Sequence, residues 1–446
     1  MRLLYVVHQF LPHHVTGTEQ YVRSMARAMQ ALGHQVTVLS YEPVLPRVAA
    51  GRTYVEQDEV VDGIEVRRVG LHLDLSPNIT LADYHNPMGS RFVRRLLDTR
   101  SFDVAHVFHL RFLGVEVLNE LRLAGLPVAV NLMDFWYLCP NFILLRSDGA
   151  LCDGPPQNGL GCISCENPQL AGELAWLGLD GEIARLSPNL PRPVDQRTTV
   201  TSRARAYVGR KDHLLAALAG ADAVVAPSKF LRRMFEANGF PAGIIRHVPY
   251  GIDPDRFGCD HGSRQAAPGS PLRIGYVGSI TPHKGLHVLI PAVRALGRDG
   301  WQLHVHGMLD THPSYTARLQ ELAAGDPRIT FHGAFAPTEL GRVLAGLDLV
   351  VVPSLWYENT PFSVLEARAM GVPVVASDLG GISEVIVPGQ DGFLFRAGDQ
   401  DALAGVLGGI LDDPEQLRAM TCGGGRTLAD NAAEFVALYA ELLSSW

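Results

Sequence analysis

Two carboxylates, Glu358 and Glu366, stand eight positions apart in the segment WYENTPFSVLEARAMGVPVVASDLGG. An ionised carboxylate only accepts hydrogen bonds and can take two hydroxyl donors, so this pair suits a hydroxyl-rich ligand. Between them, Thr360, Pro361 and Ser363 predict the start of a helix, because Pro suits the first helical position and Thr or Ser caps free amides. Such amides attract phosphate. The alternative is that both glutamates are ordinary solvated charges on a helix.

Two apolar runs predict where this segment lies in a sheet. A strand at Leu349–Val352 leads into the loop that carries Glu358, and a strand at Pro373–Ala376 follows the helix. A strand, helix, strand order indicates parallel pairing. The loop is therefore expected at the carboxyl end of a parallel sheet, where open α/β folds bind their ligands.

The composition limits the class of protein. A chain of 446 residues exceeds the roughly 250 to 300 residues at which one core stops growing, so two domains are expected. With 47% hydrophobic residues and a formal net charge of -8, the chain has no basic footprint for nucleic acid. The first apolar run stops at His8 and no run of about 18 apolar residues follows, so we expect neither a secretory signal nor a membrane span, and a cytoplasmic protein.

Apolar runs alternate with helical patterns in two successive halves of the chain. In the first half the predicted strands are Arg2–Val7, Gln35–Ser40, Ile64–Val69, Val104–Phe108, Val128–Leu132 and Ala223–Ala226. After a Gly-, Pro- and Ser-rich stretch at 258–271 they are Leu272–Val277, Gln302–His306, Ile329–Phe331, Leu349–Val352 and Pro373–Ala376. Strands that alternate with helices predict the α/β class, with mostly parallel sheets covered on both faces.

Five segments give the chain a family likeness. They are HQFLPHHVTGTE (8–19), GADAVVAPSKF (220–230), HVPYGID (247–253), YVGSITPHKG (276–285) and ENTPFSVLEARAMGVPVVASDLGGISEVI (358–386). In these segments the chain resembles glycosyltransferases of the GT-B fold, and is most similar to the retaining glycosyltransferase family 4, in a subgroup with a cysteine-bearing insertion. The likeness covers nearly the whole chain.

The resemblance implies an architecture of two facing Rossmann-like domains with a cleft between them. The implied acceptor-side domain spans residues 1–252, with the cysteine-bearing insertion at about 139–205. A linker at 253–270 would precede a donor-binding domain at 271–430. The last helix, at 431–446, would cross back onto the first domain.

By the same resemblance, Lys284 would contact the diphosphate of a nucleotide-sugar donor, Glu366 its ribose and Glu358 its sugar. Many relatives carry Arg where this chain has Ser279, so Lys284 would act without a partner cation. The alternative for Lys284 is a solvated surface lysine. The implied donor-binding set is Gly17, Thr18, Ser279, Lys284, Glu358, Asn359, Thr360, Pro361, Phe362, Ser363 and Glu366.

The first half of the chain offers candidates for the acceptor side. Gly17 follows a strand, where a residue without a side chain allows close approach of a phosphate or sugar. A lone glycine there is more often a plain turn glycine, but the neighbouring Glu19 and the helix that follows favour the functional interpretation. His106 and His109 lie at the end of the strand Val104–Phe108, and a neutral imidazole there could orient a hydroxyl. The resemblance favours His109 as catalytic, with Glu358 and Lys284; the alternative is a buried structural histidine. Asp134 is a further candidate, beside Met133 where relatives often carry His.

Four cysteines gather in a Gly- and Pro-rich stretch: Cys139, Cys152, Cys162 and Cys165. Only the final CxxC has the usual zinc spacing, yet four thiolates could bind one structural zinc ion. An iron–sulfur cluster, disulfides or free thiols are the alternatives. A catalytic metal is not expected, since four thiolates would close the coordination shell.

A run of basic residues spans Arg192 to Lys211, with Asp195 as its only acid. It could hold an anionic acceptor or lie peripherally on anionic lipid at the inner membrane surface. The alternative, which is more common for a charge run, is a solvated face.

We therefore expect a retaining glycosyltransferase that moves a sugar from a nucleotide-sugar donor to a glycan, lipid-linked or small-molecule acceptor, without a cofactor for transfer. A sugar-nucleotide epimerase or a phosphorylase on the same fold is an alternative. A non-catalytic subunit that binds a partner through the cysteine loop is another.

Overall fold

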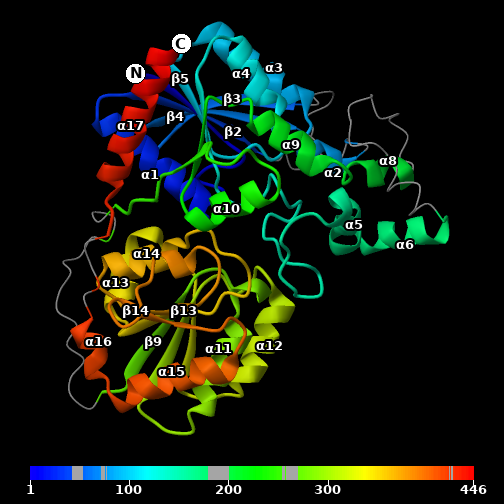
Figure 1. The fold of residues 1–446 in the computed structure, drawn as a ribbon. Helices are drawn as coiled ribbons and strands as arrows, with labels where there is room; N and C mark the ends of the chain where they lie inside the picture. The colour runs from blue at the N-terminus through cyan, green and yellow to red at the C-terminus, as the bar shows by residue number, and fades with distance from the viewer. Residues whose placement is uncertain are drawn as a thin grey trace. The chain divides into compact units, whose positions relative to one another are not determined.

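The computed structural model describes residues 1–42, 54–71, 76, 78–178, 200–253, 257, 270–420, 422 and 425–446. They form two compact units (Figure 1). Unit 1 comprises Met1–Pro249 and Leu428–Trp446, and unit 2 comprises Tyr250–Thr427. Most of the linker expected at 253–270, and residues 179–199 of the insertion expected at 139–205, lie outside the described residues.

Unit 1 is an eight-stranded sheet with helices packed on it. Its strands are β1 (Arg2–Val7), β2 (Gln35–Tyr41), β3 (Tyr54–Val61), β4 (Ile64–Leu71), β5 (Val104–Val107), β6 (Val128–Asn131), β7 (Ala223–Ala226) and β8 (Ile245–His247). Its helices are α1 (Gly17–Ala31), α2 (Ile79–Ala82), α3 (Pro87–Thr99), α4 (Glu116–Leu123), α5 (Leu160–Glu166), α6 (Pro168–Trp176), α8 (Val200–Arg205), α9 (Arg210–Leu218), α10 (Lys229–Ala237) and α17 (Leu428–Ser445), with a 3₁₀ turn η2 (Pro156–Gly159).

The strand order of unit 1 is β3-β4-β2-β1-β5-β6-β7-β8. Every neighbouring pair is parallel except β3 with β4. From β1 the chain first builds the sheet toward β4 and then returns to build it from β5 toward β8. The order therefore reverses between β1 and β5, which makes the loops after these two strands a topological switch point.

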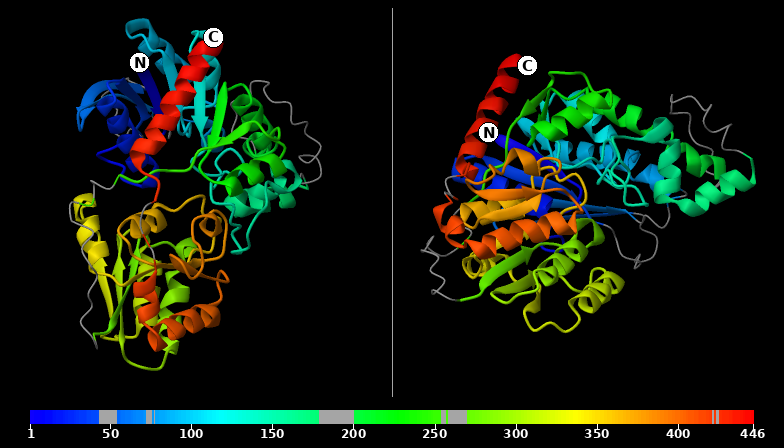
Figure 2. Two further views of the ribbon diagram at one scale, coloured as in Figure 1. Left: turned by 60° about the vertical axis from the view of Figure 1, so that its left-hand side comes forward. Right: turned by 60° about the horizontal axis from the view of Figure 1, so that its bottom comes forward.

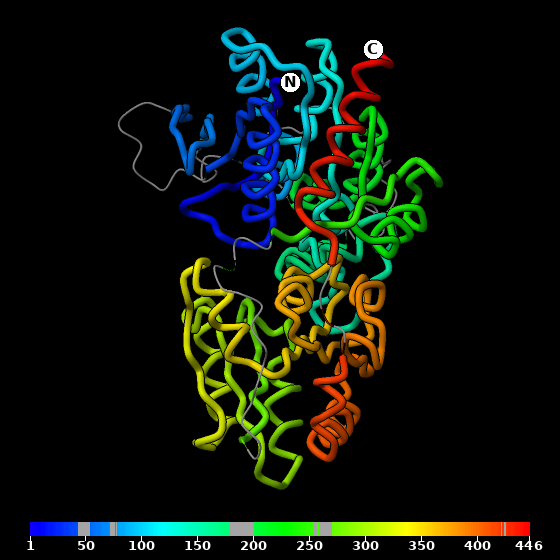
Figure 3. Tube along the Cα trace, turned by 90° about the vertical axis from the view of Figure 1, so that its left-hand side faces the viewer, coloured from blue at the N-terminus to red at the C-terminus, as the bar shows by residue number. Residues whose placement is uncertain are grey.

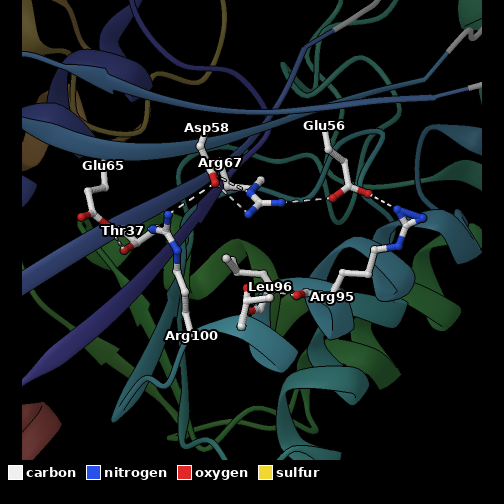
Figure 4. A network of polar contacts seen from close by, with 9 residues as sticks. Thr37, Glu56, Asp58, Glu65, Arg67, Arg95, Leu96 and Arg100 are labelled. Atoms are coloured by element: carbon white, nitrogen blue, oxygen red, sulfur yellow. Dashed lines mark hydrogen bonds and ion pairs between the residues drawn. The ribbon is translucent and has the colours of Figure 1, made fainter.

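The antiparallel strand β3 covers one edge of this sheet and is held by charged side chains (Figure 4). Arg67 on β4 pairs with Asp58 at 2.6 Å and Glu56 at 3.2 Å across the two strands. Glu56 also pairs with Arg95 of α3, and Arg100 pairs with Asp58 at 3.5 Å. Charges on an edge strand oppose pairing with a further strand.

Unit 2 is a six-stranded, wholly parallel sheet in the order β11-β10-β9-β12-β13-β14. Its strands are β9 (Leu272–Val277), β10 (Trp301–His306), β11 (Ile329–Gly333), β12 (Leu349–Val352), β13 (Val374–Ser377) and β14 (Gly392–Phe395). Its helices are α11 (Leu286–Ala295), α12 (Pro313–Ala323), α13 (Leu340–Ala345), α14 (Phe362–Ala369), α15 (Gln400–Asp412) and α16 (Glu415–Ala419), with 3₁₀ turns η4 (Pro282–Lys284), η5 (Pro337–Glu339) and η6 (Ile382–Glu384). The order reverses between β9 and β12, the switch point of this unit.

Alternation along the strands explains the three-layer packing of unit 2. Leu349 and Val351 of β12 join the core cluster that contains α11, α12 and α15, whereas Val350 and Val352 join the cluster that contains α13 and α14. Successive side chains of a strand point to opposite faces, so a run of four apolar residues feeds two cores. The helices lie on the two faces of the sheet accordingly (Figure 1). The α/β class predicted from the sequence is confirmed.

The final helix α17 packs on unit 1, beside α1 (Figures 2 and 3). Tyr21 of α1 donates to Asn431 at 2.7 Å, and Asn431 donates to the carbonyl of Pro249 at 3.1 Å. At the other end, Arg246 pairs with Glu441 at 2.5 Å. Within the described part of the chain, α17 and the other helices include none that is long and apolar enough to cross a membrane.

His106 lies under α17, in the core of unit 1. Its Nδ1 is 2.5 Å from the hydroxyl of Tyr439, and its ring stacks on Phe108 with centroids 4.1 Å apart. Only 1% of the residue is exposed. The expectation that His106 faces an acceptor is therefore wrong, because the His106 side chain points from β5 toward α17.

Burial lowers the pKa of His106 to about 3, so the unfolded chain binds a proton near pH 6.5 that the folded chain does not. Stability should therefore fall as pH drops below about 6.5. A His106→Phe variant, whatever its stability at pH 7, should lose about 2 kcal/mol less than the parent between pH 7 and 5. Denaturant unfolding at the two pH values checks this; equal losses in both proteins would show that His106 does not govern the acid sensitivity.

Candidate functional site

The switch point of unit 2 gathers the sequence-predicted donor residues. The loop after β9 carries Ser279 and Lys284, and the loop after β12 carries Glu358. These strands are neighbours and parallel, so both loops leave the sheet at the same edge. The third loop, after β13, carries Gly380 and Gly381.

The carboxylate of Glu358 is the best-anchored group at this edge. Its Oε1 accepts three hydrogen bonds, from Lys284 Nζ at 2.7 Å, Ser354 Oγ at 2.7 Å and Trp356 Nε1 at 2.9 Å. The residue is only 4% exposed. A carboxylate this deeply buried requires a counter-ion and donors, and all three come from the two neighbouring loops.

Lys284 is placed by its loop rather than by chance. Its ammonium lies 5.1 Å from the centroid of the Trp356 ring, and the next residue, Gly285, has φ +77°. A Cβ on Gly285 would lie 1.8 Å from the carbonyl oxygen of Pro353, so only glycine allows the two loops to meet. Burial and the charge of Lys284 lower the pKa of His283 to about 4. Its imidazole is therefore neutral near pH 7.

The helix α14 begins one residue later than its sequence predicts. Pro361 has ψ 125° and is the N-cap, so Phe362 rather than Pro361 is the first helical residue. Thr360 does not cap the helix either: its Oγ1 is buried and has no hydrogen-bond partner among the described residues. Asn359 is buried, and Ser363 follows in the first turn.

Glycines behind the loop fix its path. The amide of Gly381 donates to the carbonyl of Glu358 at 2.7 Å. A Cβ on Gly381 would lie 1.5 Å from the carbonyl oxygen of Asn359, so the two loops touch backbone to backbone.

The remaining predicted donor residues differ in exposure. Glu366 lies further along α14 and is buried, whereas Ser279 is exposed. The carbonyl of Ser279 accepts from the hydroxyl of Tyr276 at 2.6 Å.

The switch point of unit 1 gathers a second polar cluster. Gly17 is the first residue of α1 and Thr18 the second, so both stand at the free end of the helix. Glu19, buried in the first turn, accepts from Thr16 Oγ1 and lies 3.9 Å from His8 Nε2. In the sequence, Glu19 was considered only as a neighbour of Gly17. Its position in the first turn of a predicted helix could have identified it as a candidate site residue.

His109 and Asp134 are brought together in this cluster, from the ends of β5 and β6. His109 Nδ1 accepts from the amide of Arg111 at 3.1 Å, so the ring proton lies on Nε2, which faces Asp134 Oδ2 at 3.3 Å. His109 is only 4% exposed and uses both nitrogens, whereas Asp134 is about one quarter exposed. In this geometry His109 orients Asp134, and Asp134 is the group open to a ligand. Met133, beside it, is buried.

A buried ion-pair network supports this cluster and was not predicted. Asp83 accepts from Arg111 Nε at 2.8 Å, Trp136 Nε1 at 2.8 Å and Arg210 at 3.2 Å. Arg210 also donates to the carbonyl of Trp136 at 2.8 Å, and the amide of Trp136 donates to Asp134 at 2.8 Å. The network therefore connects α9 to the loop that carries Asp134.

The four cysteines lie in one region of unit 1, and their thiols are free. Burial raises the pKa of Cys139 to about 11 and that of Cys162 to about 12, with smaller contributions from the neighbouring thiols. A tetrahedral thiolate site needs sulfur atoms about 3.8 Å apart. No three of the described cysteines bring their sulfur atoms within 4.8 Å of one another. Cys152 instead donates to the carbonyl of Gly154 at 2.9 Å. The four thiols are therefore not arranged as a tetrahedral zinc site in this structure. Zinc binding by the cysteines stays a prediction.

Residues 192–199 of the basic run at 192–211 lie outside the described residues, which resume at Val200. In the described part, Arg203 pairs with Glu173 at 3.0 Å and Lys211 with Asp212 at 2.9 Å, while Arg210 is buried in the Asp83 network. These charges are neutralised within unit 1. Arg205 is exposed, and Arg192 and Arg197 lie outside the described residues, so the interpretation of this run as an anion-binding surface stays a prediction.

The Lys284–Glu358 contact should be measurable as a coupling energy. Replacing Lys284 by Met should destabilise the protein by about 2 kcal/mol, at the low end for a buried pair because Lys284 is partly exposed. A double-mutant cycle with Glu358→Gln should give a coupling of about 1 kcal/mol or more, since the second change costs less once its partner is gone. Strictly additive costs in denaturant unfolding would show that the two charges do not interact.

Two family models match the chain. The model described as "Glycosyl transferase 4-like domain" matches residues 16–251, just over half of the 446 residues. The model described as "Glycosyl transferases group 1" matches residues 271–413. The first match lies in unit 1, with its last residues at the unit boundary, and the second lies in unit 2.

Curated relatives carry glycosyltransferase names. D-inositol 3-phosphate glycosyltransferase of Nocardia farcinica is 35% identical over 219 residues, which cover 46% of this chain and 48% of that protein. The GDP-mannose-dependent alpha-(1-6)-phosphatidylinositol monomannoside mannosyltransferase of Mycolicibacterium smegmatis is 29% identical over 282 residues, or 58% of this chain and 72% of that protein. The chain thus spans about half the length of the first relative.

Solved structures resemble this fold along its whole length. Sucrose-phosphate synthase from Thermosynechococcus elongatus aligns over 100% of both chains with a TM-score of 0.65 and 19% identity. Anabaena HepE, solved in complex with UDP-glucose, aligns over 100% of both chains with a TM-score of 0.58 and 17% identity. Together with the two largely parallel sheets and the match over 16–251, these findings show that the chain belongs to the glycosyltransferases of the GT-B fold that carry the glycosyl transferase 4-like domain.

Proposed function

We propose that the protein is a retaining glycosyltransferase that moves a sugar from a nucleotide-sugar donor to a hydroxyl acceptor. The observation that carries this proposal is the convergence of Lys284, Ser354 and Trp356 on Glu358 Oε1 at the switch point of unit 2. Such a site holds a fixed cation and a fixed carboxylate side by side. These are the groups that a departing diphosphate and a hydroxyl-rich sugar require.

Lys284 can serve the donor without leaving Glu358. An ammonium group has three donors, and one of them faces Glu358 Oε1 at 2.7 Å. The remaining two can contact phosphate oxygens, and the negative charge that develops on the leaving diphosphate strengthens those bonds. Glu358 in turn keeps Lys284 in position before the donor arrives, so less ordering is needed on binding.

The start of α14 supplies the rest of the proposed donor site. Pro361, the N-cap of α14, makes no side-chain cap bond, and the Thr360 hydroxyl, which lacks a partner in the described structure, can donate to a phosphate at this helix start. Glu366 on α14 would accept from the ribose hydroxyls. The names of relatives and structural neighbours include GDP-mannose and UDP-glucose, which supports a nucleoside diphosphate sugar as the donor class.

In the proposed reaction the bond between the sugar C1 and the diphosphate oxygen breaks, and a bond from C1 to the acceptor oxygen forms on the same face of the ring. The acceptor proton passes to the departing diphosphate, so no protein base is required. Lys284 balances the charge that the diphosphate gains. Asp134, oriented by His109, is the proposed contact for an acceptor hydroxyl. The relatives' names support glycans or inositol phosphates as acceptors to test.

The two glutamates should separate binding from turnover. Glu366→Gln should weaken binding of the nucleoside diphosphate by about 10- to 150-fold, because a hydrogen bond to a charged group contributes about 1.5 to 3 kcal/mol. Glu358→Gln should mainly slow transfer, since its proposed partner is the sugar. Calorimetric titration with UDP, GDP and ADP, followed by turnover with the matching sugar nucleotides, measures both effects.

Glu321→Gln is the matched control, because Glu321 is exposed on α12 of the same unit. It should leave affinity and turnover unchanged. Parent-like behaviour of both Glu366→Gln and Glu358→Gln would refute the assignment of this site. The anomeric configuration of the product, read by NMR, tests the retaining outcome separately: an inverted product would refute it even if the site is correct.

Ser279→Arg should strengthen binding of the nucleoside diphosphate, because a second cation would then stand in the exposed loop that leads to Lys284. Ser279→Gln, similar in length but uncharged, is the control. The gain should shrink as the salt concentration rises, since an exposed charge is screened. Equal affinities for the Arg and Gln variants at low salt would place Ser279 away from the diphosphate.

A further inference from the structure

His85, Glu116 and His213 converge from three separate elements of unit 1. His85 lies in the turn before α3, Glu116 is the first residue of α4, and His213 lies on α9. One ligand atom from each residue lies within 4.8 Å of the other two, and within the described ranges this is the only such group of three or more His, Cys, Asp or Glu. The helices α4 and α9 contact each other.

His213 gives an independent reason to look for a ligand here. Its Nε2 is fully covered by protein and, within the part of the chain that the structure describes, has no hydrogen-bond partner. The ring lies against Tyr84 with centroids 5.9 Å apart, and against His85 at 6.2 Å. A buried polar nitrogen without a partner is costly, and a metal ion would satisfy it.

The carboxylate of Glu116 is already oriented for such a role. Its Oε2 accepts from the amide of Asn86 at 3.1 Å, and its Oε1 pairs with His85 Nδ1. The backbone packs closely around it: a Cβ on Gly114, which has φ +82°, would lie 2.5 Å from Glu116 Oε2. Outer hydrogen bonds of this kind commonly fix the ligands of metal sites.

We propose that His85, Glu116 and His213 bind a divalent transition-metal ion, and that zinc is the ion this donor set fits best. Two imidazoles and one carboxylate make a usual three-residue zinc set, with a further position for a non-protein ligand. Magnesium and calcium prefer oxygen donors and are disfavoured by two nitrogen ligands. The site is separate from the four cysteines, and it does not depend on the proposed transfer reaction.

Binding here would add a cross-link between two segments that already contact each other. Asp83 and His85 belong to one turn, and Arg210 and His213 belong to one helix, α9. The Asp83–Arg210 pair at 3.2 Å joins these segments on one side, and the metal would join them again two or three residues further on. The ion would therefore hold Arg210, and through it Trp136, in place.

Zinc titration of chelator-treated, full-length protein tests the proposal. The parent should bind one Zn²⁺ per chain, with a rise in Tm, and should show no response to Mg²⁺. Replacing a residue that only supports a metal ligand weakens metal binding by about 10- to 100-fold. Because His213 and Glu116 are themselves proposed ligands, His213→Gln and Glu116→Gln should each weaken Zn²⁺ binding by more than this. His312→Gln, which alters an exposed histidine of unit 2, should bind like the parent.

The cysteines provide the decisive comparison. Cys162→Ser and Cys165→Ser should keep the same Zn²⁺ affinity and stoichiometry as the parent. Circular dichroism of each variant separates loss of metal from loss of fold: a folded His213→Gln with parent-like Zn²⁺ affinity overturns the proposal. So does a parent that binds no Zn²⁺, or zinc that is lost in Cys165→Ser but kept in His213→Gln.

Discussion

A buried carboxylate must be given a cation and donors, and the structure of unit 2 around its switch point follows from this requirement. Glu358 Oε1 is reached by Lys284 from the loop after β9 and by Ser354 and Trp356 from its own loop. To bring those loops together, Gly285 must let the backbone of Pro353 approach, and Gly381 must let the backbone of Asn359 approach. An uncompensated charge at this depth would cost several kcal/mol, so the two loops are held by the same interaction that forms the candidate site.

Both units carry a charged cluster near their switch point, but the polar groups in the two clusters differ. Each unit is a largely parallel sheet whose strand order reverses once, and each places its charged cluster in the loops at or next to that reversal. In unit 2 the cluster is a cation facing a carboxylate. In unit 1 it is two histidines and two acids, with His109 facing Asp134 and His8 facing Glu19. The Asp83 network stands behind the second cluster, where Arg210 supports the loop of Trp136 and Asp134.

The sequence predicted what depends on local pattern and missed what depends on side chains meeting in space. Apolar runs such as Arg2–Val7 and Leu349–Val352 became strands because alternate residues feed the cores on opposite faces. The strand β3 was missed because its polar residues do not form an apolar run, although Asp62-Gly63, with φ 51° and 78°, is a recognisable hairpin turn. The pairing of Lys284 with Glu358 joins residues 74 positions apart, and no spacing rule reports it. His106 was misplaced because its position in a strand does not say which helix will cover its side chain. The covering residue is Tyr439, which lies 333 positions later in the sequence.

The return of α17 to unit 1 has a consequence for how the molecule is made. The segment Tyr250–Thr427 of unit 2 is inserted, in sequence, between two parts of unit 1. During synthesis, the sheet of unit 1 can form while Tyr5, Tyr21 and His106 still lack the side chains of α17 that will cover them. These surfaces stay open until all of unit 2 has left the ribosome. Unit 1 can therefore be completed only after unit 2 has been translated. A chain interrupted within unit 2 would leave an apolar and aromatic face of unit 1 exposed, and cellular quality control could recognise that face.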